Sequence, residues 1–204
     1  MQSILVPWMQ AVALLSLGYL SGSLPFAVWI TQAFKGVDVR SAGSGHATTT
    51  NTIRQAGFLP GVLVFVLDIS KGFLPTLLAI RFAPFPWVVP MTACLVVVGH
   101  CWPIFAGFRG GMGLASAGGG LLATQPLGFV IALGVLISLT LIIHHSARAS
   151  VFTGLLIAPA IWLVGMHGMV FWVAVCTGLI IAIRFLVDWN RKYRELWLDR
   201  EKTA

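Results

Sequence analysis

Charged residues are scarce in this sequence, and long stretches contain none. Only 9% of the 204 residues are charged, whereas 58% are hydrophobic. Soluble domains carry about 25% charged residues, so a soluble globular fold is excluded. No charge occurs in residues 1–34, 110–147 or 149–183, and each stretch exceeds the ~20 apolar residues that span a bilayer. The sequence therefore predicts an all-α, polytopic membrane helix bundle that forms a single domain, residues 1–204.

Other absences narrow the function further. No basic residue precedes the first apolar run, which argues against a signal peptide. The three cysteines, Cys94, Cys101 and Cys176, lack metal-ligand spacing and stand in apolar runs, so we expect small buried packing residues. No metal or other cofactor is expected. The formal charge is +7, but the sequence predicts no soluble basic surface that could bind nucleic acid. Nucleic acid is therefore not an expected partner.

The apolar runs predict five to seven transmembrane helices. The first covers about residues 4–33 and bends near Pro25, because proline interrupts the hydrogen bonds of a helix. Residues 121–145 form either one span or two shorter ones that are broken near Gln125 and Pro126. Polar, glycine-bearing loops are expected at residues 35–57 and 106–120, and the remaining helices at about 58–80, 87–105, 151–164 and 169–187.

The basic residues predict the orientation in the membrane. Seven of the 13 lie after position 147, most of them in the tail at about residues 188–204, and others lie in the segments around Arg40 and Arg109. Loops rich in Lys and Arg remain in the cytoplasm, so the tail and both loops are expected there. An odd number of spans then places the N-terminus outside. The same charges also attract phosphate-bearing substrates or anionic lipids.

The first loop reads RSAGSGHATTTNTIR over residues 40–54. Gly43 and Gly45 allow backbone amides to converge on an anion. Arg40 and Arg54 can grip phosphate in bidentate fashion, and a helix beginning near Thr50 adds its positive N-terminal end. The alternative is a flexible, solvated loop. The neutral donors of this segment are Ser44, Thr48, Thr49, Thr50 and Asn51.

An ionisable pair interrupts the second apolar run. Asp68 and Lys71 are three residues apart, so they share one helical face. Ionisable groups within membrane helices are costly, and they indicate function by default. The alternatives are a structural ion pair between helices, or a helix that ends at Gly72 and leaves Lys71 at the interface.

A third polar segment again combines basic charge with glycine. His100 lies close to the predicted helix end, and Arg109 directly precedes Gly110 and Gly111. Such amides and a guanidinium together favour anion binding. For His100, both a structural role and an acid–base role remain open.

Together these segments resemble the bacterial membrane glycerol-3-phosphate acyltransferases that use acyl-phosphate as the donor. The GSGN…GATN motif of that family, with an arginine three residues on, is represented here by GSGHATTTN at 43–51 and Arg54. Its D-x-x-K-G-x-x-P motif is intact at residues 68–75. Its GHxxPxFxxFxGGKG motif matches residues 99–113, and its tail motif R-H-x-x-N-I-x-R matches residues 184–191. The resemblance covers most of the chain.

Several departures fall within these motifs. His46 and Asp188 replace asparagines, Thr48 replaces a loop glycine, Met112 replaces a lysine, and Phe185 replaces a histidine. Losing a charge-assisted contact costs ~1.5–3 kcal/mol, and a carboxylate at position 188 is expected to repel phosphate. The alternative reading is thus a catalytically impaired paralogue that binds phosphorylated lipid or regulates an active acyltransferase.

The resemblance implies a multi-pass protein of the bacterial plasma membrane with its active face cytoplasmic. Its partners would be acyl-phosphate, glycerol 3-phosphate and membrane lipids, and its product lysophosphatidate. Because acyl-phosphate is already activated, the protein mainly positions substrates and neutralises charge. His46 and His100 are the expected catalytic residues. The expected phosphate-binding residues are Gly43, Ser44, Gly45, Thr50, Asn51, Arg54, Lys71, Arg109, Gly110, Gly111 and Arg184.

Overall fold

The computed structural model describes residues 2–191, and these residues form helices and loops without any strand. Most of the predicted basic tail, residues 192–204, lies outside the described residues. The elements are α1 (Gln2–Gly22), α2 (Phe26–Lys35), η1 (Val39–Ser41), α3 (Thr49–Ala56), α4 (Phe58–Phe82), α5 (Val88–Cys101), η2 (Ile104–Ala106), α6 (Leu114–Thr124), α7 (Pro126–Ile143), α8 (Ser146–Leu163) and α9 (Met169–Leu186).

Six segments within residues 2–191 are long and apolar enough to cross a membrane, which confirms the polytopic all-α prediction. The first comprises α1 and α2 together, and the others are α4, α5 with η2, α7, α8 and α9. Helix α6 is apolar but has only 11 residues. In helix α7 only Gly128 is fully buried by protein, and its other residues are half-buried or exposed, as expected of a helix that faces lipid on one side.

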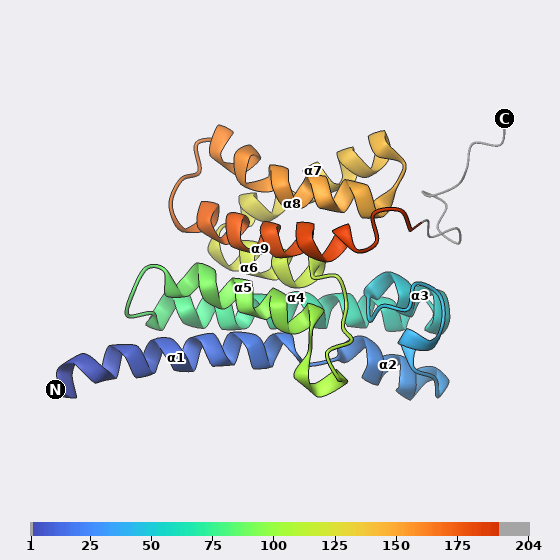
Figure 1. Ribbon diagram of the computed structural model, residues 1–204, viewed down its shortest axis with the longest axis horizontal. Helices are drawn as coiled ribbons and strands as arrows, with labels where there is room; N and C mark the ends of the chain where they lie inside the picture. The colour runs from blue at the N-terminus through green and yellow to red at the C-terminus, as the bar shows by residue number, and fades with distance from the viewer. Residues whose placement is uncertain (1, 192–204) are drawn as a thin grey trace.

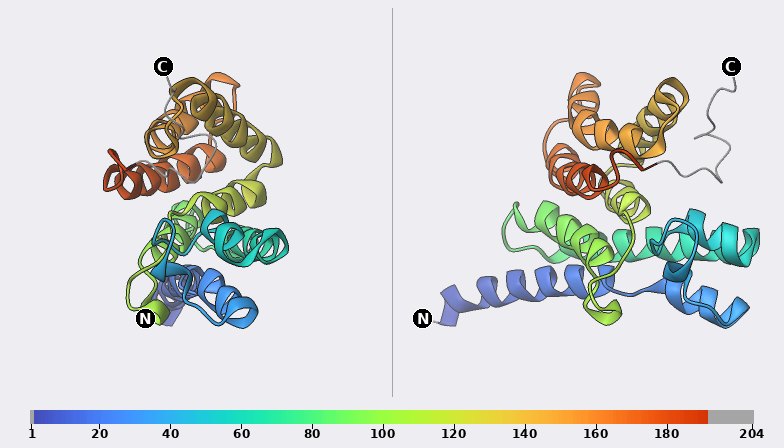
Figure 2. Two further views of the ribbon diagram at one scale, coloured as in Figure 1. Left: turned by 90° about the vertical axis from the view of Figure 1, so that its right-hand side faces the viewer. Right: turned by 45° about the vertical axis from the view of Figure 1, so that its right-hand side comes forward.

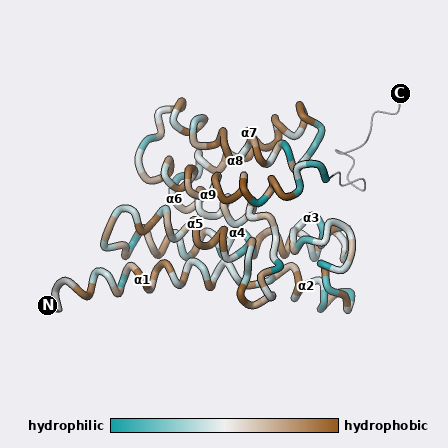
Figure 3. Tube along the Cα trace, viewed as in Figure 1, coloured by the Kyte–Doolittle hydropathy of each residue, from teal (hydrophilic) through white to brown (hydrophobic). Residues whose placement is uncertain are grey.

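The long helices lie side by side along one direction (Figure 1). Helices α1 and α2 form one edge of the bundle, α4 and α5 come next, and α7 and α8 form the opposite edge, with α6 and α9 between them (Figures 1 and 2). The start of α1 and the end of α9 lie at opposite ends of the bundle. Hydrophilic residues gather mainly at one end of the bundle, where α3 and the last turn of α9 lie (Figure 3).

The interruptions in the chain largely follow its prolines. The first span breaks at Pro25, between α1 and α2, as predicted. The run 121–145 breaks between α6 and α7, where Pro126 begins α7. The predicted helix 87–105 is shorter than expected, because α5 ends at Cys101 just before Pro103. Helix α4 does not end at Gly72 but continues through Pro75 to Phe82, so Lys71 lies in the middle of a helix.

One predicted loop is partly wrong. The sequence predicts a loop for residues 106–120, but residues 114–120 belong to α6. The glycines of this segment bring α6 close to its neighbours: a Cβ at Gly119 would run into the carbonyl oxygen of Ile69 in α4. From α4, a Cβ at Gly72 would run into the Ser116 carbonyl. Small residues allow this close approach in membrane bundles, so these glycines are packing residues and not helix breakers.

Candidate active site

The first glycine loop is built around the buried side chain of Asn51. Its Nδ2 donates to the carbonyl oxygens of Val39 (2.7 Å), Ala42 (3.1 Å) and His46 (3.1 Å), and its Oδ1 accepts from the Ser44 N–H at 3.2 Å. Both polar atoms of the Asn51 side chain are therefore hydrogen-bonded to the backbone of the loop.

The backbone of this loop also requires glycine and a helix cap. Gly43 has φ +61°, and a Cβ there would run into Asn51 Oδ1. Gly45 has φ +71°, again a conformation that favours glycine. Thr48 Oγ1 accepts from the Asn51 N–H at 3.2 Å and caps α3. Helix α3 thus begins close to Thr50, as predicted, and hydrogen bonds to Asn51 connect the loop that precedes it.

The second glycine loop docks on the end of α5 and on the first loop. Gly111 N–H donates to the His100 carbonyl at 3.0 Å, and the Ala47 N–H donates to the Gly110 carbonyl at 3.3 Å. From α9, Arg184 Nε donates to the Gly111 carbonyl at 3.0 Å, and its guanidinium lies 5.7 Å from the centre of the Trp102 ring. Hydrogen bonds to backbone carbonyls thus join both motifs and α9 into one structure.

A buried carboxylate connects Lys71 with His100. Asp68 Oδ1 lies 2.8 Å from Lys71 Nζ and 3.6 Å from His100 Nδ1. The ammonium also donates to the Leu24 carbonyl at 3.0 Å. All three side chains are almost fully buried. A buried charge is costly unless it is paired. The opposite charges of Lys71 and Asp68 therefore compensate each other, next to His100.

A second histidine–carboxylate pair connects the first loop with the end of α9. His46 Nε2 lies 2.7 Å from Asp188 Oδ2, and Arg191 lies 3.6 Å from the other carboxylate oxygen. Asp188, which the sequence predicts to repel phosphate, thus has a histidine and an arginine beside its carboxylate. Burial lowers the pKa of His46 below its usual 6.5, against the opposing effect of Asp188.

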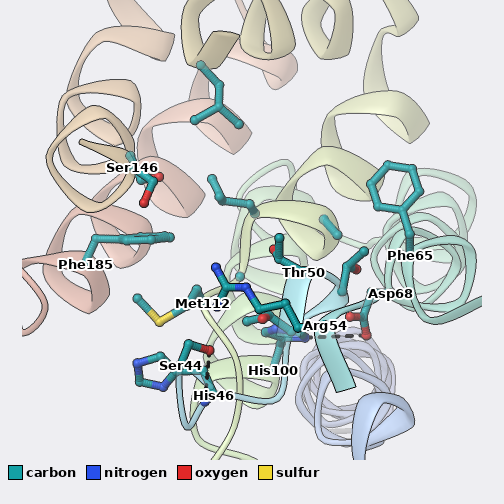
Figure 4. A pocket seen from close by; sticks show the side chains of 17 residues that line it. Ser44, His46, Thr50, Arg54, Phe65, Asp68, His100, Met112, Ser146 and Phe185 are labelled. Atoms are coloured by element: carbon teal, nitrogen blue, oxygen red, sulfur yellow. Dashed lines mark hydrogen bonds and ion pairs between the residues drawn. The ribbon is translucent and has the colours of Figure 1, made fainter. Parts of the chain in front are cut away.

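A cavity of about 310 Å³ lies between the glycine loops and helices α4, α6, α7, α8 and α9. Figure 4 shows Arg54 reaching into its middle, with Ser146 and Phe185 facing it from another side. Its polar lining is Ser44, His46, Thr48, Thr49, Thr50, Arg54, Asp68, His100, Ser146 and Ser150. The rest of its lining is mostly apolar, formed by Phe65, Met112, Gly113, Leu114, Ala115, Leu136 and Phe185.

The predicted site residues fall into two groups. Those that line the main cavity are Ser44, His46, Thr50, Arg54 and His100. Of the others, Lys71, Gly110 and Gly111 border a much smaller void beside Asp68 and His100. The side chain of Arg109 is exposed, and its carbonyl accepts from Arg40 at 3.2 Å. Gly43, Gly45, Asn51 and Arg184 do not line the main cavity, and Asn51 and Arg184 bond to backbone carbonyls.

Sequence reasoning missed the far wall of the cavity. Ser146 and Ser150 come from the first turns of α8, in the segment that the sequence leaves between the predicted helices 121–145 and 151–164. Phe65 and Leu136 come from α4 and α7. The single available signal was the spacing of the two serines, which places both on one face of a helix.

Comparisons with known proteins agree on one family. A family model described as "Glycerol-3-phosphate acyltransferase" matches residues 12–195. The glycerol-3-phosphate acyltransferase of Aquifex aeolicus (strain VF5) is 36% identical over 188 residues, which cover 90% of this chain and 95% of that protein. The corresponding protein of Laribacter hongkongensis (strain HLHK9) is 36% identical and covers 88% of each chain.

A solved structure has the same fold. The crystal structure of PlsY, an integral membrane glycerol 3-phosphate acyltransferase in its glycerol 3-phosphate form, matches with a TM-score of 0.79. The two chains are 35% identical, and the match covers 89% of this chain and 90% of that chain. The lysophosphatidic acid form of PlsY matches with a TM-score of 0.77.

Proposed function

This chain belongs to the glycerol-3-phosphate acyltransferase family and is a multi-pass acyltransferase of a bacterial membrane, and we propose that its acyl donor is an acyl-phosphate. The acyl chain moves to the 1-hydroxyl of glycerol 3-phosphate, giving lysophosphatidate and phosphate. The observation that carries the proposal is a cavity in which a guanidinium and two histidines meet a partly apolar wall. Both substrates are anionic at one end, and the donor is apolar at the other.

Arg54 supplies the main positive charge for the phosphates. It comes from α3 and lines the cavity, together with the hydroxyls of Ser44 and Thr50. A guanidinium and hydroxyl donors suit phosphate oxygens. Gly43, Gly45 and Asn51 act indirectly in this proposal, because they hold the loop that presents Ser44. Arg184, Gly110 and Gly111 likewise support the position of His100.

The transfer needs one proton acceptor and a position for the acyl chain. The hydroxyl oxygen of the acceptor attacks the acyl carbon, the bond to the phosphate oxygen breaks, and phosphate leaves with the bonding electrons. The hydroxyl proton goes to His46 or His100, both of which line the cavity. The acyl chain lies against the apolar wall formed by Phe65, Leu114 and Leu136. Positioning and charge neutralisation supply most of the catalysis.

The active end of the bundle faces the cytoplasm in this proposal. The arginines of both glycine loops and of the end of α9 belong to one connected structure: Arg40 donates to the Arg109 carbonyl, and Arg191 pairs with Asp188. Such a concentration of basic residues is typical of the cytoplasmic side. Glycerol 3-phosphate would then enter the cavity from the cytoplasm and the acyl donor from the membrane.

A turnover assay tests this function. Purified protein in lipid is given acyl-phosphate and isotope-labelled glycerol 3-phosphate, and both lysophosphatidate and phosphate are measured. The expected result is phosphate release that depends on glycerol 3-phosphate and matches lysophosphatidate one to one. Unphosphorylated glycerol is the matched control and should give little product. Tight binding of glycerol 3-phosphate without turnover would instead support the impaired paralogue.

A further inference from the structure

The pair formed by His46 and Asp188 joins two residues 142 positions apart at the edge of the cavity. The Nε2–Oδ2 distance is 2.7 Å, and the side chains are 13% and 6% exposed, respectively. Both positions depart from the motifs of the resembled family, which has an asparagine at each. Two departures that meet in a short hydrogen bond form one local unit.

The hydrogen bond fixes which ring nitrogen of His46 can take up a proton. With Nε2–H donating to the Asp188 carboxylate, Nδ1 carries the lone pair. Among residues 2–191 no group is hydrogen-bonded to Nδ1. His46 lines the cavity together with Ser44 and Arg54, so the residue that would take up this proton belongs to the cavity wall.

The charges around His46 favour a neutral ring at neutral pH. Asp188 stabilises the imidazolium, whereas Arg184 and Arg191 of α9 and its flank disfavour it, and burial is the largest effect. Arg54 and His100 face the same cavity from α3 and α5. The pKa of His46 is therefore lowered, which leaves the ring in the form that a general base requires.

The other histidine is less suited to this step. His100 Nδ1 lies 3.6 Å from Asp68, beyond ordinary hydrogen-bond length. Lys71 already neutralises the same carboxylate oxygen at 2.8 Å. The carboxylate therefore orients His100 less firmly than Asp188 orients His46.

We propose that His46 is the general base of the transfer and that Asp188 is its positioning residue. This inference rests on the proposed function. His46 Nδ1 takes the proton of the acceptor hydroxyl as its oxygen bonds to the acyl carbon, and the phosphate leaves with the electrons of the broken carbon–oxygen bond. The imidazolium, stabilised by Asp188, then returns its proton to the released phosphate, so no other reactant is needed.

The test compares wild type with His46→Asn/Asp188→Asn over pH 5 to 9. Two amides can keep a hydrogen bond between the loop and the end of α9, but neither takes up a proton between pH 5 and 9. The readout is the ratio of the wild-type kcat/KM to that of the variant, because titration of the substrate phosphates cancels in it. We expect a ratio of about 10² to 10⁴ at pH 8, declining about tenfold per pH unit once His46 becomes protonated below pH 6.5.

Single variants and a matched control complete the design. Asp188→Asn alone should lose about as much as the double variant, because residues that act as one unit give non-additive losses. His167→Asn makes the same change at an exposed histidine between α8 and α9 and should leave kcat/KM unchanged. Thermal midpoints of all variants establish that each is folded.

Two results would overturn the inference while the proposed function stands. One is a ratio near one at every pH. The other is a large ratio that does not change with pH, which marks a purely structural role for the pair. A wild-type protein that makes no lysophosphatidate at any pH overturns the proposed function itself, and the base assignment with it.

Discussion

Gly111 holds His100 in place because it has no side chain. Its N–H donates to the His100 carbonyl at 3.0 Å, and a Cβ at position 111 would run into the His100 imidazole Nε2. The His100 ring is buried and lines the cavity. The second glycine loop therefore sets the position of a histidine through close backbone contact, and any side chain at Gly111 must move that ring.

Gly111→Ala should consequently impair turnover. Forcing an extra methyl group into a packed position costs about 1–3 kcal/mol, and here the strain falls on the His100 ring. We expect kcat to fall about tenfold or more in the acyl-transfer assay. Gly134→Ala is the control, because Gly134 on α7 has open space at its Cβ position. Equal activity of the two variants would contradict this role of Gly111.

Lys71→Met should destabilise the protein more than it weakens substrate binding. The ammonium pairs with Asp68 at 2.8 Å inside the bundle, and its removal leaves an uncompensated buried carboxylate. Breaking such a pair costs about 3–5 kcal/mol. The thermal midpoint measured in detergent is the readout. Lys71→Met/Asp68→Leu removes both charges and should recover much of the loss; a double variant less stable than the single one would refute the argument.

Arg54→Gln should raise KM for the phosphorylated substrates. Arg54 reaches into the cavity, and the loss of a charge-assisted contact costs about 1.5–3 kcal/mol, or roughly 10- to 100-fold in affinity. Arg81→Gln is a suitable control, because Arg81 is an exposed arginine in the last turn of α4. An unchanged KM for glycerol 3-phosphate and acyl-phosphate in Arg54→Gln would show that Arg54 does not bind their phosphates.

His46 should make the folded state sensitive to mild acid. Its pKa in the folded protein lies below 6.5 because burial disfavours the imidazolium. The unfolded chain therefore binds this proton first as the pH falls. Stability from the neutral, buried ring is complete above about pH 6.5 and is lost as the pH drops towards the lowered pKa. Thermal midpoints between pH 8 and 5 should fall more steeply for wild type than for His46→Asn/Asp188→Asn, and parallel curves would refute this.

The sequence determined the class of this protein and the segments that carry its chemistry. Charge-free runs that are long enough to cross a bilayer as a helix are compatible with little besides membrane helices. Local chain chemistry also placed the break at Pro25 and the start of α3 near Thr50, because proline and helix caps act on their immediate neighbours. The break before Pro126 was one of two alternatives that the sequence left open. The motif order was sufficient to predict the family.

The tertiary structure decided what each motif residue contacts, because contacts between residues far apart in the sequence depend on how the helices pack. Asn51 and Lys71 read as phosphate ligands, yet one is enclosed by its own loop and the other pairs with Asp68. Met112 and Phe185 read as separate losses of polar groups, yet they pack in one apolar cluster beside the cavity. Asp188 reads as a repulsive charge, yet folding brings it to His46, and only that approach turns two unusual residues into one pair.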